Sequence, residues 1–259
     1  MHSTQAVPPL FHPPPLSLLV TEPLRALFDN LAAHINVTPP AVGDGHPVVI
    51  YPGLGAGAFT TGHLRRFVKE SGFTVHDWEC GVNTGPEGIF DDWLGSLDDR
   101  VRELHRLHGR KVSLVGWSLG GVYAREIAKR CPKAVRQVIT LGTPFAALAG
   151  GNHAGTVFKL LNKDRAHLPP ELELRLRQRP PVPTTSIYSK TDGIVSWRGC
   201  IERKSELAEN VEVDTSHLGM VSHPQVLRIV VDRLAQPEGK WRPLQRVKRL
   251  GREARLKAA

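Results

Sequence analysis

The stretch KVSLVGWSLGG, from Lys111 to Gly121, decides the fold class of this chain. It predicts a buried strand over 111–115, then a G-x-S-x-G turn centred on Ser118, then a helix over 122–130. A serine on a tight strand-to-helix turn has strained backbone geometry that exposes its hydroxyl, and the flanking glycines remove side chains that would collide there. The N-terminus of the helix also presents free N–H groups and partial positive charge. The stretch therefore predicts a nucleophile at Ser118.

Apolar strands and helices alternate on both sides of this stretch. Strands are predicted over 47–51, 73–78, 135–141, 185–189 and 210–213, and helices over 61–70 and 224–234. A further helix ends before Gly109 and carries one apolar face made of Trp93, Leu97, Val101, Leu104 and Leu107. Continuous apolar strands that alternate with helices indicate a parallel sheet covered on both faces. The predicted fold class is therefore α/β, with a mostly parallel central sheet and helices on both faces.

The chain divides into three parts, 1–38, 39–236 and 237–259. The central part has the size of one domain, and its change to Gly-rich, basic and then Pro-rich sequence over 145–183 predicts a small cap inserted over the sheet, with a short apolar helix around 157–161. The first part is proline-rich as far as Pro15 and then predicts a helix capped by Thr21.

The N-terminal helix carries one apolar stripe. Its members are Leu24, Leu27, Phe28, Leu31 and Ile35. We expect this stripe to dock on the body of the protein and to close an edge of the core. Contact with a membrane is the alternative, which the lack of basic residues on the polar face disfavours.

Basic residues are concentrated in the last part of the chain. From Lys240 to the end there are eight basic residues and one acidic residue, a net charge of +7 that leaves +2 of the total +9 for the rest. The body therefore offers no basis for a nucleic-acid-binding groove. Trp241, Leu244, Val247 and Leu250 recur among the basic residues, a pattern that suits peripheral contact with an anionic membrane. A solvated, partly disordered extension is the alternative, and it is the interpretation that we favour.

Cys80, Cys131 and Cys200 lie far apart, in a spacing that suggests neither a disulfide framework nor a metal site. The N-terminus lacks the basic start and the apolar core of a secretion signal. No apolar run approaches the roughly 20 residues needed to cross a bilayer as a helix. We expect a cytoplasmic protein, at most peripheral at a membrane surface, with no metal.

A reactive serine needs a base within hydrogen-bond reach and an acid that orients the base. Asp192 follows the strand predicted over 185–189, and His217 follows the strand over 210–213. The competitors are Asp214, which is too close to His217 along the chain to approach its ring from the side, and His223, which precedes a proline as a helix-start residue does. The predicted catalytic residues are therefore Ser118, Asp192 and His217.

Two backbone N–H groups are needed to stabilise an oxyanion. Leu119 follows the nucleophile, and Leu54 lies in the glycine-rich loop after the first strand. This loop has the spacing G-x-G-x-G and no following Gly-Lys-Ser/Thr, so phosphate binding is disfavoured. Candidate substrate-binding residues are Trp117, Asn83 and Phe145, although a structural loop amide is the alternative role for Asn83.

These motifs resemble those of the α/β-hydrolase superfamily, and in particular its lipase-like and esterase-like branch, including uncharacterised bacterial α/β hydrolases. The resemblance covers roughly 47–234 and rests on the motifs PGLG at 52–55, WSLGG at 117–121, TLGTP at 140–144, TDGIV at 191–195 and SHLG at 216–219. It implies the α/β-hydrolase fold, acyl-enzyme chemistry and no cofactor. Pro52 departs from the pattern, because many lipases carry a histidine there, and this leaves the substrate class open.

We therefore expect a serine hydrolase that cleaves a small-molecule or lipid ester through an acyl-enzyme. An acyltransferase or thioesterase that uses the same residues is a second interpretation, because the unseen cap decides whether water reaches the acyl-enzyme. A hydrolase-like scaffold that binds without turnover is a third. The complete set of serine, aspartate and histidine argues against this last interpretation.

Overall fold

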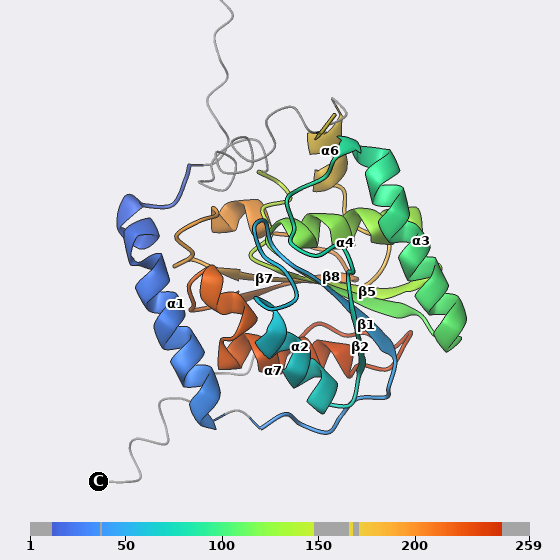
Figure 1. The fold of residues 1–259 in the computed structure, drawn as a ribbon, viewed down its shortest axis with the longest axis horizontal. Helices are drawn as coiled ribbons and strands as arrows, with labels where there is room; N and C mark the ends of the chain where they lie inside the picture. The colour runs from blue at the N-terminus through green and yellow to red at the C-terminus, as the bar shows by residue number, and fades with distance from the viewer. Residues whose placement is uncertain (1–11, 37, 148–165, 168–170, 245–259) are drawn as a thin grey trace, which may run out of the picture.

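A six-stranded parallel sheet forms the centre of the molecule (Figure 1). The strand order is β2-β1-β4-β5-β7-β8. The strands are β1 (Pro47–Tyr51), β2 (Thr74–Asp77), β4 (Val112–Trp117), β5 (Val135–Leu141), β7 (Thr184–Ser189) and β8 (Ala208–Val213). The computed structural model describes residues 12–36, 38–147, 166–167 and 171–244. The α/β fold class predicted from the sequence is confirmed.

Helices cover both faces of the sheet, as Figure 1 shows. They are α2 (Gly62–Glu70), α3 (Phe90–His108), α4 (Leu119–Arg130) and α7 (Pro224–Leu234). The core accordingly divides into two apolar clusters, one with α3 and α4 and the other with α2 and α7. Alternate residues of β4 point to opposite faces, so Val112 and Leu114 join the first cluster and Val115 and Trp117 join the second.

The apolar face of α3 differs from the prediction at one residue. Leu97, Val101 and Leu104 are buried, whereas Leu107 is 72% exposed. At 3.6 residues per turn, Leu107 lies roughly 100° around the helix from the centre of the buried stripe. The helix ends as predicted, with Gly109 in the left-handed conformation at φ 60°.

The N-terminal helix α1 (Leu16–Asn36) docks on the body by the opposite face from the one predicted. Its apolar residues Leu16, Val20, Leu24, Leu27, Phe28 and Leu31 are all more than half exposed. Glu22 and Ala26 are buried instead. Thr21 lies inside the helix, where its Oγ1 donates to Ser17 O at 2.8 Å, so the predicted cap is wrong. The side chain of Ile35 lies outside the described residues.

Two polar side chains determine which face of α1 docks. Glu22 and Asp29 are two helical turns apart, so they project from one face. Glu22 accepts hydrogen bonds from both of the loops that follow β7 and β8, and Asp29 accepts from the loop that follows β8. Hydrogen bonds to a charged group contribute more than neutral ones, and these contacts take the place of the expected apolar packing.

The predicted cap region is described in part. It contains α6 (Leu172–Arg177) and the short strand β6 (Ala166–His167), which pairs in parallel with β3 (Gly88–Ile89). The apolar helix expected around 157–161 lies outside the described residues. Within the described ranges, no helix combines the length and hydropathy of a bilayer-crossing segment.

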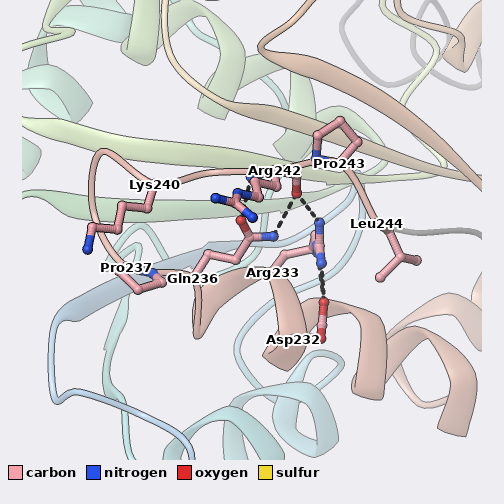
Figure 2. Close-up of a pocket in the computed structure, with 8 residues that line it drawn as sticks. All are labelled: Asp232, Arg233, Gln236, Pro237, Lys240, Arg242, Pro243 and Leu244. Carbon is pink, nitrogen blue, oxygen red and sulfur yellow. Dashed lines mark hydrogen bonds and ion pairs between the residues drawn. The ribbon is translucent and has the colours of Figure 1, made fainter.

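Residues 237–244 fold back against the end of α7, as Figure 2 shows. Arg242 O accepts hydrogen bonds from Arg233 Nη1 at 2.8 Å and Gln236 Nε2 at 2.9 Å. These residues line a hollow of about 500 Å³. Trp241 and Leu244 are half-buried on the body, so half of the apolar pattern predicted to face a membrane is packed here. Val247 and Leu250 lie outside the described residues.

Candidate active site

Ser118 lies on a strained turn between β4 and α4, as the sequence predicts. Its backbone has φ 52° and ψ −122°, in a region that side-chain-bearing residues rarely adopt. The glycines around it are required by close approach. A Cβ on Gly120 would lie 2.4 Å from Tyr51 O, and one on Gly116 would lie 2.3 Å from Gly121 Cα. The turn therefore brings the start of α4 directly against the end of β1.

Asp192 and His217 form a buried hydrogen-bonded pair. The Nδ1 atom of His217 lies 2.6 Å from Oδ2 of Asp192. The other carboxylate oxygen, Oδ1, accepts from the backbone N–H groups of Ile194 and Val195, each at 2.8 Å. Asp192 follows β7, and His217 lies between β8 and the short 3-10 helix η2 (Leu218–Val221). The carboxylate is thus held by its own loop and presents one oxygen to the imidazole.

The residue before the serine contacts the histidine directly. Trp117 donates from Nε1 to His217 O at 3.1 Å, and the centroids of the two rings are 5.8 Å apart. Among the described residues, the Ser118 hydroxyl makes no hydrogen bond to the imidazole. Catalytic hydrogen bonds are often long before substrate binds and shorten in the complex. The structure therefore joins Asp192 to His217 and brings both to the edge of the sheet where Ser118 lies.

The two competitors make other contacts, and His223 has the helix-start role that the sequence predicts. Asp214 is exposed and accepts from Thr191 Oγ1 at 2.8 Å. His223 is the N-cap of α7, where its side chain accepts from Gln225 N at 3.3 Å. Neither makes a hydrogen bond to the His217 imidazole in the part of the chain that the structure describes.

The loop after β1 lies beside Ser118. A Cβ added to Gly53 would be 3.2 Å from Ser118 Cβ. Within this loop, Gly55 N donates to Asn83 O at 2.8 Å and Ala56 N donates to Gly53 O at 3.1 Å. The N–H of Leu54 has no acceptor among the described residues, and Leu119 is the first residue of α4, whose N–H has no carbonyl partner inside the helix.

The three candidate substrate-binding residues are buried and contact other residues of the protein. Asn83 is fully buried, donates from Nδ2 to Pro52 O at 2.8 Å and accepts from Tyr123 Oη at 3.1 Å. Its amide therefore holds the loop after β1, which is the structural alternative. Phe145 is buried with the Arg125 guanidinium 3.7 Å from its ring centroid. Trp117 is buried and supports His217.

The pKa of His217 is raised above its ordinary value of 6.5. Burial of the ring acts to lower the pKa, because it disfavours the charged form. The charge of Asp192, the hydrogen bond to it and the charge of Glu22 act in the opposite direction and outweigh burial. An imidazole that is stabilised once it gains a proton is suited to act as a general base.

The contacts of α1 with this site were not predicted from the sequence. Glu22 accepts from the N–H of Leu218, next to His217, and Asp29 accepts from Ser216 N at 3.1 Å. A signal was present, because the two acidic residues share the face of the helix opposite its apolar stripe. The sequence could not show which backbone donors they meet.

A second Ser-His-Asp arrangement lies at the other end of the strands, near the start of β1 and β4. His46 Nε2 is 2.8 Å from Ser113 Oγ, and His46 Nδ1 is 2.5 Å from Asp44 Oδ1. Ser113 and His46 are fully buried, and Ser113 lies within β4, where strand pairing takes the backbone N–H groups. This set has the hydrogen bonds of a triad without access for a substrate.

No group of three metal-ligating side chains is present in the described ranges.

The sheet and the turn at Ser118 define an α/β hydrolase. Residues 47–190 match the palmitoyl protein thioesterase family, and the chain belongs to this family of hydrolases. The match includes Ser118 and the loop of Leu54 and ends before Asp192 and His217.

Two curated serine hydrolases match part of the chain. The chain is 31% identical over 103 residues to the human serine hydrolase BPHL, covering 38% of this chain and 35% of that protein, and 30% identical over 108 residues to the mouse protein, covering 39% and 37%. The chain thus spans about a third of the length of these relatives.

Two solved lipases share the fold. Aspergillus fumigatus lipase B has a TM-score of 0.58 and 19% identity, covering 79% of this chain and 56% of that one. The monoacylglycerol lipase of Paleococcus ferrophilus has a TM-score of 0.54 and 17% identity, covering 74% and 96%.

Proposed function

We propose that this protein hydrolyses carboxylic esters of small molecules or lipids through a covalent acyl-enzyme on Ser118. The observation that carries the proposal is the buried 2.6 Å contact between Asp192 and His217, which lies at the same end of the sheet as a serine in strained backbone geometry and contacts the residue before that serine. A serine hydroxyl is a weak nucleophile without such a base. The family to which the chain belongs supports acyl transfer as the reaction class.

In the proposed reaction, Ser118 Oγ bonds to the acyl carbon while its proton passes to Nε2 of His217. Asp192 holds the imidazolium, and the N–H groups of Leu54 and Leu119 donate to the oxyanion. The proton then passes to the leaving alcohol as the bond between it and the acyl carbon breaks. Water, deprotonated by His217, releases the acid and restores the serine.

Thioesters are the second candidate substrate class. The family name specifies palmitoyl protein thioesters, and the same acyl-enzyme forms when a thiol leaves in place of an alcohol. An acyltransferase would pass the acyl group from Ser118 to an acceptor other than water. Product analysis distinguishes these outcomes, because a hydrolase releases free acid and a transferase requires the acceptor.

The test is hydrolysis of p-nitrophenyl esters and acyl-coenzyme A thioesters of increasing acyl length, with Ser118→Ala beside the wild type. We expect the variant to lose on the order of 10⁴-fold in kcat/KM on the substrates that the wild type cleaves. Ser113→Ala is the matched control, since Ser113 also lies near a histidine but is fully buried. Normal turnover by Ser118→Ala would refute the proposal.

A further inference from the structure

A single carboxylate on α1 joins the loop of the proposed acid to the loop of the proposed base. Oε2 of Glu22 accepts from Gly193 N at 3.0 Å, and Oε1 accepts from Leu218 N at 2.9 Å. Gly193 follows Asp192 and Leu218 follows His217 in the chain. The two oxygens of one side chain therefore fix the backbone immediately after each member of the pair.

The environment of Glu22 shows that this carboxylate is built into the fold. Its relative exposure is 2%. Arg25 donates from Nη2 to Glu22 Oε2 at 2.7 Å and from Nη1 to Thr191 O at 2.5 Å. A buried carboxylate is tolerated only when charge and hydrogen bonds compensate for lost water, and here two amides and one guanidinium do so. Through Arg25, this ion pair also connects α1 to Thr191, the residue before Asp192.

Two glycines allow α1 to approach the loops. A Cβ on Gly193 would lie 2.4 Å from Leu18 O and 2.8 Å from Glu22 Oε2. A Cβ on Gly219 would lie 2.0 Å from Asp29 Oδ2. Asp29 also accepts from Thr215 Oγ1 at 2.9 Å and Ser216 Oγ at 2.7 Å. The close packing at both glycines therefore fixes the position of α1 against the two loops.

We infer that Glu22 is a positioning residue, which sets the Asp192 and His217 loops at the spacing that their hydrogen bond requires. The inference rests on the proposed function of that pair and goes beyond it, because it gives the N-terminal helix a part in the reaction. Glu22 contacts only backbone amides and Arg25 in these interactions, so it acts through the loops and not on the substrate.

The inference also has a consequence for protonation. The charged or titratable groups around the His217 loop are Asp192, Cys200, Asp214 and His223 from the body, and Glu22, Arg25 and Asp29 from α1. The negative charge of Glu22 contributes to the raised pKa of His217. Because attack requires the neutral imidazole, loss of this charge moves the rising limb of the pH profile to lower pH.

The test compares full-length wild type, Glu22→Gln and Leu27→Gln. Leu27 is exposed on the opposite face of the same helix and serves as the control. The readout is the rate of labelling of Ser118 by a fluorophosphonate probe as a function of pH. We expect Glu22→Gln to label between about tenfold and 100-fold more slowly than the wild type at neutral pH. The rise of its labelling rate with pH should occur at lower pH than in the wild type. Leu27→Gln should match the wild type in both respects. A folded Glu22→Gln with the wild-type rate and limb overturns the inference.

Glu22→Asp covers the case in which Glu22→Gln does not fold. Aspartate keeps the charge but is one methylene shorter, so it cannot reach both amides. We therefore expect slow labelling, with the rise in labelling rate at the same pH as in the wild type. Wild-type labelling by this variant overturns the inference. Absence of labelling in the wild type itself contradicts the proposed function instead. In that event the pKa of His217 measured by NMR, assigned with His217→Gln, still tests Glu22: the inference requires a lower pKa in Glu22→Gln.

Discussion

At the scale of single residues, Ser113 lies on β4 and Ser118 on the turn that follows it. Each lies at an end of the sheet where a histidine is hydrogen-bonded to an aspartate. Ser118 has strained backbone geometry at the start of a helix and keeps 9% of its surface exposed, whereas Ser113 is fully buried within paired strands. Backbone geometry and exposure therefore distinguish the proposed nucleophile from a structural hydroxyl. The G-x-S-x-G spacing contained this information for Ser118, while the contact of Ser113 with His46 requires the fold to be known.

His46 should make the stability of the protein depend on pH. Burial lowers the pKa of its imidazole to about 4, although Asp44 acts in the opposite direction. The unfolded chain takes up a proton near pH 6.5 and the folded one does not, so the contribution is present above pH 6.5 and is lost as the pH falls toward 4. The expected loss is on the order of 3 kcal/mol.

The measurement for His46 is urea unfolding from pH 7.5 to 4 in wild type and His46→Gln. The variant lacks the titrating group, so its free energy of unfolding should fall less steeply over this window. Parallel curves for the two proteins would show that His46 does not cause the loss.

At the scale of elements, the apolar pattern predicted the helix α1 but not the face by which it docks. The pattern measures the side chains of the helix alone, and the donors that Glu22 and Asp29 meet come from loops almost 200 residues later in the chain. The strands and α7 were predictable, because their apolar runs can be satisfied only in a buried sheet and on its faces. The pairing of Asp192 with His217 was predictable because each residue follows a predicted strand and both come after Ser118 in the chain.

The exposed stripe of α1 gives a prediction about stability. Phe28→Ser and Leu24→Ser should each change the free energy of unfolding by no more than about 0.5 kcal/mol, because both side chains already lie in water. Thermal unfolding of the two variants measures this. A loss of about 2 kcal/mol or more would indicate a buried stripe and contradict the docking of α1 described above.

At the scale of the whole molecule, the proposed contact between the basic tail and a membrane depends on residues 245–259. Trp241 and Leu244 pack on the body, so truncation after Leu244 removes the remaining basic residues without exposing that packing. If the tail contacts a membrane, the full chain sediments with vesicles of anionic lipid and the truncated chain stays in solution. The difference should disappear at high salt.

Vesicles of neutral lipid are the control for the tail, and neither protein should sediment with them. Equal sedimentation of the full and truncated chains with anionic vesicles would exclude the tail as the contact. The sequence could predict the charge of this segment, but its first residues return to α7 through contacts that the charge pattern does not contain.

The hydrogen bonds from α1 to the two loops are made largely to main-chain atoms. Recognition of this kind ignores side-chain identity and is sensitive to chain length. Related sequences are therefore free to exchange the side chain of Leu218, but not to add one at Gly193 or Gly219. Inserting one residue in either loop would shift the amides that follow it out of register with the helix.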